Sequence, residues 1–108
     1  MELSNVIQEV NEAAKRLESS ADALFKLGRE KAEAERNYRS KLAQEILKLR
    51  ADKMPVSIVT DIAKGNVSDA LFERDVAESA FKAGIEVTDA IKVRISAYQT
   101  ILKYQSDI

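Results

Sequence analysis

This chain of 108 residues contains no cysteine, no histidine and no tryptophan. Without cysteine it can form no disulfide framework, no thiolate metal site and no cysteine nucleophile. Without histidine it lacks the commonest general base and the commonest transition-metal ligand. These absences exclude several chemistries, and they leave carboxylates as the side chains best able to hold a metal ion.

Net charge and long hydrophobic runs are also scarce. A formal net charge of -1 provides no bulk attraction to nucleic acid or to an anionic membrane. No uninterrupted apolar run approaches the roughly 20 residues that a membrane span requires, and the first residues, M-E-L-S-N-V, do not resemble a signal peptide. With 45% hydrophobic and 32% charged residues, we expect one folded helical domain, residues 1–108, located in the cytoplasm and without a membrane partner.

The only proline, Pro55, and one of the three glycines lie within residues 53–68, a segment called the joint below. Proline disfavours helical geometry in the residue before it, which predicts that a preceding helix ends near residues 51–53. Six apolar side chains of the joint are too many for a solvated loop, and we expect them to close one end of the fold: Met54, Val56, Ile58, Val59, Ile62 and Val67.

Three small residues of the joint predict where its helices begin and end. Ser57 is expected to cap a short helix that extends to residue 64. Gly65 is expected to close that helix in a left-handed conformation. Ser68, followed by an acid, is expected to cap the last helix.

The first helix is predicted over residues 4–51. An apolar seam with spacings of four and three is typical of a coiled coil: Leu3, Ile7, Val10, Ala14, Leu17, Ala21 and Leu24. The following residues 29–37 lose this stripe, and we expect them to be helical but largely solvated. The seam returns with an offset at Tyr38, Leu42, Ile46 and Leu49. We expect the helix to continue through Gly28, and two helices hinged there are the alternative.

The last helix is predicted over residues 69–105, and it carries two adjacent apolar rows. The first consists of Ala70, Ala77, Phe81, Gly84, Ile91, Ile95, Tyr98 and Leu102. The second row consists of Phe72, Val76, Ala80, Ala83, Val87, Ala90, Ala97, Ile101 and Tyr104. A helix that covers a single partner needs only one such stripe. The pattern therefore predicts an all-α, long antiparallel helical hairpin, coiled-coil-like, with a short helix at the joint.

The second row also predicts a homodimer or a higher oligomer. One preceding helix and the joint can cover about one row, and monomers rarely expose so long an apolar patch. The predicted interface comprises Phe72, Val76, Ala80, Ala83, Val87, Ala90, Ile101 and Tyr104. A first helix broken at Gly28 and folded back could instead cover this row within one chain.

Three pairs of acids lie three residues apart, which puts both carboxylates of each pair on one helix face: Glu9/Glu12, Glu30/Glu33 and Asp75/Glu78. Such pairs resemble those with which all-α nucleotide pyrophosphohydrolases hold Mg²⁺, an ion that prefers carboxylate and water oxygens. On one continuous helix, however, the first two pairs lie too far apart to share an ion. Glu9/Glu12 could face Asp75/Glu78 across the hairpin only if the register aligned, which leaves an Mg²⁺-dependent nucleotide pyrophosphohydrolase as one alternative. Because no nucleophile is placed beside an activating base either, we expect no cofactor and no enzymatic activity.

Basic residues in the middle of the chain leave a second alternative open. A basic surface could contact single-stranded DNA, with Tyr38 stacking on a base, and it would consist of Arg36, Arg39, Lys41, Lys48 and Arg50. Neighbouring glutamates dilute this positive charge, so a solvated helix face with i to i+4 ion pairs is the favoured interpretation.

About three quarters of the chain carry a resemblance to known proteins. The segments are Y-R-S-K-L-A-Q-E-I-L-K-L-R, then M-P-V-S-I-V-T-D-I-A-K-G-N-V, then the alanine-rich last helix. Together they resemble small helical accessory proteins of bacteriophages that infect Gram-positive bacteria. In such genomes these proteins tend to lie among early replication and recombination genes. The resemblance implies a phage-encoded accessory or regulatory protein, and it supplies no catalytic residue. Our own expectation is a non-enzymatic protein-interaction or assembly module that offers a surface to a protein partner.

Overall fold

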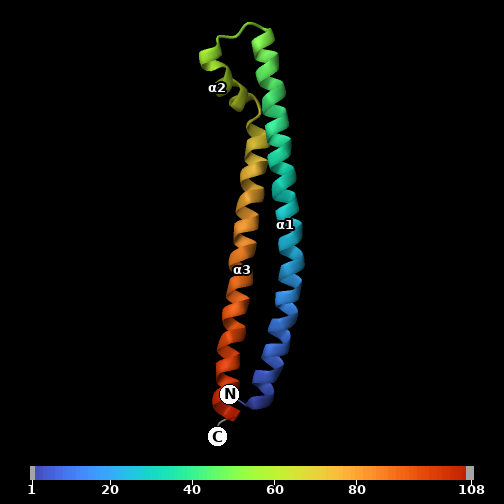
Figure 1. Ribbon diagram of the computed structural model, residues 1–108, viewed down its shortest axis with the longest axis vertical. Coiled ribbons are helices and arrows are strands. Elements are labelled where there is room, and N and C mark those ends of the chain that lie inside the picture. Colours follow the sequence, from blue (N-terminus) through green and yellow to red (C-terminus); the bar gives the residue numbers. More distant parts are fainter. Residues whose placement is uncertain (1, 107–108) are drawn as a thin grey trace. The chain divides into compact units, whose positions relative to one another are not determined.

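The structure, a computed structural model, describes residues 2–106, and in that range the chain forms three α-helices and no strand. Helix α1 comprises Leu3–Ala51, α2 comprises Val56–Asn66, and α3 comprises Ser68–Ser106 (Figure 1). The prediction of an all-α helical hairpin with a short helix at the joint is confirmed. Helix α1 is unbroken at Gly28, so the hinged alternative is wrong.

Contacts divide the chain into two compact units, each built from parts of both long helices. The terminal unit combines α1 up to Lys26 with α3 from Lys82 onward, and the joint unit consists of Leu27–Phe81. Within each unit the two long helices lie side by side and run in opposite directions (Figure 1).

In the terminal unit, the first apolar row of α3 packs against α1. Ile91 is buried there, and the hydroxyl of Tyr98 donates a hydrogen bond of 3.4 Å to Oε2 of Glu9. Thr88 is also buried, and its hydroxyl donates to the carbonyl oxygen of Gly84 at 2.9 Å, which satisfies the polar group inside the helix pair. The prediction that this row faces the partner helix is confirmed.

The predicted seam at the start of α1 is displaced by one residue. Val6 and Ala13 are buried, whereas Ile7 and Ala14 are exposed. The residues that both seams share remain half-buried: Val10, Leu17 and Leu24. Two neighbouring rows of α1 are apolar, and the sequence pattern alone does not distinguish them. The packed seam also accepts Ser20, half-buried, which no hydrophobicity pattern selects.

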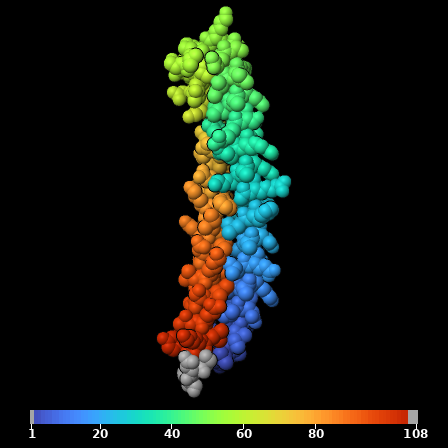
Figure 2. All heavy atoms as spheres, in the orientation of Figure 1, coloured from blue at the N-terminus to red at the C-terminus, as the bar shows by residue number. Residues whose placement is uncertain are grey.

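In the joint unit, the seam of Tyr38, Leu42, Ile46 and Leu49 faces inward as predicted. Leu49, Val59 and Ala63 form the buried centre of a cluster between α1 and α2, with Leu42, Ile46, Met54 and Ile62 packed around it. Figure 2 shows the side chains of α2 against the last turns of α1. Of the six apolar residues expected to close the joint, Val56 and Ile58 are exposed.

The stretch 29–37 is less solvated than predicted. Lys31, Ala34 and Glu35 are half-buried, and they lie on the packed side of α1 in the joint unit, as Tyr38 does. The Lys31 ammonium lies 5.3 Å from the centre of the Phe81 ring. Long polar side chains bury their aliphatic stems while their charged ends reach water or a ring face, so a polar sequence can still occupy a packed seam.

Helix α1 ends in a Schellman motif whose left-handed residue is Lys53, with φ 63°. The amide of Met54 donates to the carbonyl oxygen of Leu49 at 3.0 Å. The amide of Lys53 donates to the carbonyl oxygen of Arg50, also at 3.0 Å. Met54 also packs against the cluster that contains Leu49, which is the apolar contact that accompanies this motif. Pro55 holds Met54 out of the helical region, so the helix cannot continue and the backbone changes direction at Lys53.

The three small residues of the joint do not act as predicted. Helix α2 begins at Val56 with Pro55 as its N-cap and no side-chain capping bond, so Ser57 lies inside the first turn. Gly65 is helical, since no glycine in the described range has a positive φ. Ser68 is the first residue of α3, and Val67 occupies the break between the helices. A one-residue break lets Val67 serve both helices: its amide donates to Ala63 and its carbonyl accepts from Leu71.

Because Gly65 is helical and not left-handed, a side chain at this position should stabilise the protein. We expect Gly65→Ala to raise the free energy of unfolding by about 0.5–1 kcal/mol, because glycine in a helix costs conformational entropy that alanine does not. A Cβ built at Gly65 meets nothing within 4 Å. At Gly28 the added Cβ would lie 3.3 Å from the Phe81 ring, so Gly28→Ala should raise the free energy of unfolding by less than Gly65→Ala does. Thermal unfolding of both variants measures the difference, and a lower melting temperature for Gly65→Ala would contradict the helical assignment.

Lys53 gives a matched prediction at the end of α1. Lys53→Gly is expected to stabilise the protein by about 0.5–1 kcal/mol, because a side chain disfavours the left-handed conformation. Asp52→Gly is the control, since Asp52 has no positive φ and should gain nothing. Urea unfolding followed by circular dichroism measures both. Equal effects of the two substitutions would show that Lys53 carries no conformational strain.

Candidate functional site

The second apolar row of α3 is left largely exposed by the described chain. Phe72 is 65% exposed, Val87 is 54% exposed and Tyr104 is 70% exposed. Val76, Ala83 and Ala90 are also exposed, and Ala80 and Ile101 are half-buried. Helix α1 is unbroken at Gly28, so it does not fold back at that residue to cover this row. The predicted interface residues therefore form a surface that the chain itself does not cover.

In the joint unit this surface has acidic neighbours. Phe72 and Val76 lie one turn apart on α3, and Asp69 and Glu73 lie within a turn of them. All four side chains are exposed. An apolar strip bordered by carboxylates favours a partner that presents apolar groups between cations.

In the terminal unit the same row has basic neighbours. A hollow of about 190 Å³ is lined by Arg16, Val87, Ala90, Ile91 and Arg94. A second hollow, of about 410 Å³, shares Arg16, Val87 and Ile91 and extends along α1 to Lys15 and Ala23. Val87 thus stands between two hollows with apolar floors and cationic borders. These cations contrast with the acids around Phe72, although the exposed Glu86 directly precedes Val87 on α3.

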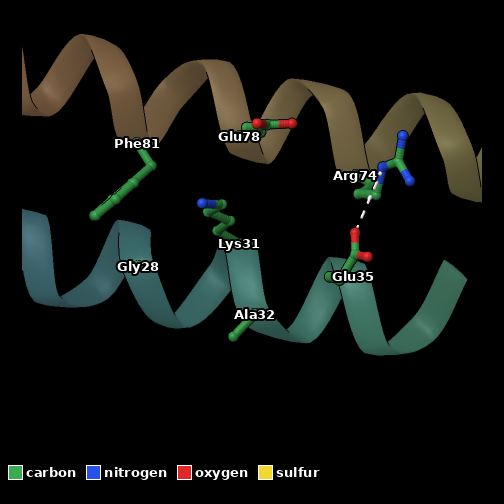
Figure 3. Close-up of a pocket in the computed structure, with 7 residues that line it drawn as sticks. All are labelled: Gly28, Lys31, Ala32, Glu35, Arg74, Glu78 and Phe81. Carbon is green, nitrogen blue, oxygen red and sulfur yellow. Dashed lines mark ion pairs between the residues drawn. The ribbon is translucent and has the colours of Figure 1, made fainter. Parts of the chain in front are cut away.

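A third hollow, of about 690 Å³, lies in the joint unit between α1 and α3, on a different side of α3 (Figure 3). Phe81 reaches from α3 toward Gly28, whose missing side chain leaves room for the ring (Figure 3). Lys31 covers the ring from α1. Glu35, Arg74 and Glu78 line the rest, together with Ala32. None of the seven lining residues bears a hydroxyl or thiol that could act as a nucleophile.

Arg74 connects the two helices beside this hollow. Its guanidinium lies 4.6 Å from the centre of the buried Tyr38 ring and 3.5 Å from Oε2 of Glu35. The hydrogen bonds that it donates to Asp75 raise the pKa of the Arg74 guanidinium. Partial desolvation lowers this pKa, and the negative charges of Asp75 and Glu35 raise it. Arg74 is therefore cationic at any usable pH, and its contacts are those of a structural clamp.

The predicted basic surface does not form one patch. The five residues point to two sides of α1, as the helical repeat of 3.6 residues requires. One side carries Arg36, Arg39 and Arg50, and the opposite side carries Lys41 and Lys48. All five are exposed. Arg39 donates to Glu35 at 2.7 Å, which confirms the expected i to i+4 pair and reduces the positive field.

The acid pairs are not brought together. Glu9 and Glu12 belong to the terminal unit, where Glu9 accepts from Tyr98 and Glu12 accepts from Gln8. In the joint unit, Glu33 pairs with Arg29 and Asp75 pairs with Arg74. Among the described residues, no three acids lie close enough together to hold a metal ion.

Comparison of the chain with protein families, with curated proteins and with solved structures gave no match. Among residues 2–106, no helix combines the length and the apolarity needed to span a membrane. The chain's own surface therefore carries the functional argument.

Sequence reasoning missed several exposed apolar residues that belong in this argument. Val93 is 69% exposed on α3, next to the second row, and Phe25 and Leu47 are exposed on α1. Val93 could have been found from its spacing, because it lies two turns beyond Glu86 and four turns beyond Ser79, on the border of the second row.

Proposed function

We propose that the protein is a non-enzymatic interaction module that assembles as a homodimer through the second apolar row of α3. The observation that carries this proposal is the exposure of that row in the single chain. The proposed contact consists of the predicted interface residues Phe72, Val76, Ala80, Ala83, Val87 and Ala90.

Apolar area left exposed on the single chain favours assembly. Large apolar patches are rare on monomers because each exposed side chain forgoes the free energy of leaving water. A chain of this size has little interior of its own, and in the terminal unit the buried apolar side chains of the described residues are only Val6, Ala13 and Ile91. Pairing two hairpins into a four-helix assembly would add a second interior along α3.

A second copy of the chain is the partner best supported by charge. Phe72 has the acids Asp69 and Glu73 beside it, and the hollow at Val87 is bordered by Arg16 and Arg94, with the exposed Glu86 next to Val87. One surface therefore carries both acids and cations for a complementary partner. Two-fold symmetric contacts use one patch twice, and a patch with opposite charges at its two ends is suited to that arrangement.

Light scattering coupled to size-exclusion chromatography tests the proposal. Between about 1 and 100 μM, we expect a mass near twice the 12.0 kDa of one chain, declining toward 12.0 kDa on dilution. A mass of one chain at the highest concentration would overturn the homodimer.

The two enzymatic and nucleic-acid alternatives have no supporting observation. Of the acids that could hold Mg²⁺, Glu33 and Asp75 pair with arginines, and the three acid pairs are not brought together. The basic residues lie on two sides of α1. The resemblance to phage accessory proteins is compatible with a module whose activity depends on what it binds. In that role the dimer would present two copies of its remaining surfaces to a further protein.

A further inference from the structure

The exposed row of α3 has a regular spacing of its own. Val76, Ala80, Ala83, Val87, Ala90 and Arg94 are separated alternately by four and three residues. This is the spacing of a coiled-coil seam, displaced by one residue from the seam that faces α1. The row is therefore built to pack against one further helix along several turns.

Two copies of this row fit each other in one antiparallel register. If Val76 faces the second copy's Val87, then Ala80 faces Ala83 at the centre of the pair, where small side chains let two backbones approach closely. The same register sets Asp69 opposite Arg94 of the second copy, and it sets Glu73 opposite Ala90, one turn from that arginine. Each pairing occurs twice, once on each side of the two-fold axis.

The register also accounts for two exposed residues that flank the seam. Phe72 and Val93 are among the most exposed large apolar side chains of α3, at 65% and 69%. Both precede a seam position by one residue, and in an antiparallel pair such flanking positions face each other across the interface. Phe72 of one copy thus meets Val93 of the other and covers it from water.

Other arrangements place charges badly. In a parallel pair, Arg94 would face Arg94 and Glu73 would face Glu73 of the second copy, and like charges at a seam repel. Sliding the antiparallel pair by seven residues in one direction puts Arg94 against Val76. Sliding it in the other direction puts Asp69 against Val87. Either shift buries a charge against a valine without a partner.

We infer that the homodimer forms by antiparallel pairing of α3 with α3 of a second copy, in the register that joins Asp69 to Arg94 and Val76 to Val87. This inference rests on the proposed function, which supplies the second copy as partner. It adds the direction, the register and an ion pair that selects them.

Exchanging the two charges tests the register. Asp69→Arg creates two arginine–arginine contacts in its homodimer, and Arg94→Asp creates two acid–acid contacts. We expect the dimer of each variant alone to have a dissociation constant about tenfold or more above that of the unchanged protein. An equimolar mixture of the two variants restores both opposite-charge pairs in the heterodimer, so the mixture should regain the mass and affinity of the unchanged dimer. If mixing restores nothing, the register is wrong.

Cysteine cross-linking gives an independent readout, because the chain has no native cysteine. Under mild oxidation, Val76→Cys mixed with Val87→Cys should give a disulfide-linked dimer, whereas neither variant alone should do so. Cross-linking of one variant with itself would establish a parallel pair and overturn the inference. A dimeric mass without any cross-link would overturn this interface and leave the proposed dimer standing. A monomeric mass would overturn the proposed function itself.

Discussion

Val87→Asp is expected to convert the homodimer into a folded monomer. In the proposed dimer Val87 lies inside the seam opposite Val76 of the second copy, where an unpaired carboxylate costs about 3 kcal/mol or more. Each dimer would contain two such carboxylates, so the dissociation constant should rise more than a hundredfold. In the single chain Val87 is 54% exposed, and an aspartate there can remain in water. Light scattering reports the mass, and circular dichroism reports that the helices are retained.

Leu47→Asp is the matched control for this change. Leu47 is 70% exposed, lies inside a helix as Val87 does, and would acquire the same charge. It is on α1, outside the proposed contact, so this variant should keep the dimeric mass. A Val87→Asp protein that remained dimeric, or a Leu47→Asp protein that became monomeric, would contradict an interface on α3.

Tyr38→Ala is expected to have the largest effect on folding. The Tyr38 side chain is 5% exposed, packs within the seam of the joint unit and carries the Arg74 guanidinium on its ring. Truncation removes the buried ring, leaves a cavity and takes away the surface on which Arg74 rests. Replacing a buried aromatic residue by alanine costs about 3–5 kcal/mol, a large share of the stability of a domain of this size.

Tyr38→Phe separates the ring from its hydroxyl. The phenylalanine ring keeps the packing and the contact with Arg74, so we expect this variant to lose less than about 1 kcal/mol. Urea unfolding should be compared at one fixed protein concentration, because a dimer's apparent stability depends on concentration. A Tyr38→Ala protein within about 1 kcal/mol of the unchanged one would show that the seam is not held at this residue.

The extents of the helices follow from local chemistry and were predicted closely. Pro55 lacks an amide donor and restricts Met54, so α1 ends at Ala51 whatever packs around it. The last helix was also predicted to within a residue at each end, because long runs of helix-forming residues leave few alternatives. The inward row of α3 was found because its large apolar residues repeat every three or four positions.

Capping in the joint was predicted wrongly because several residues could satisfy it. Ser57, Gly65 and Ser68 each fit a capping rule, but the chain uses Lys53 for the left-handed turn and leaves Gly65 inside a helix. Lysine is a poor choice for that conformation on local grounds. The contact of Met54 with the Leu49 cluster compensates, and it exists only after α2 has folded against α1.

By itself, the sequence determined the helical class, the places where the two long helices end and the presence of a surplus apolar row on α3. These properties depend on backbone chemistry and on residue spacing within one helix. Tertiary structure decided which of two apolar rows of α1 is buried, Val6 and Ala13 rather than Ile7 and Ala14. It also placed Lys31 and Glu35 in the seam through Phe81 and Arg74. Such choices depend on the register between two helices, since a side chain is buried only where a particular residue of the other helix lies opposite it.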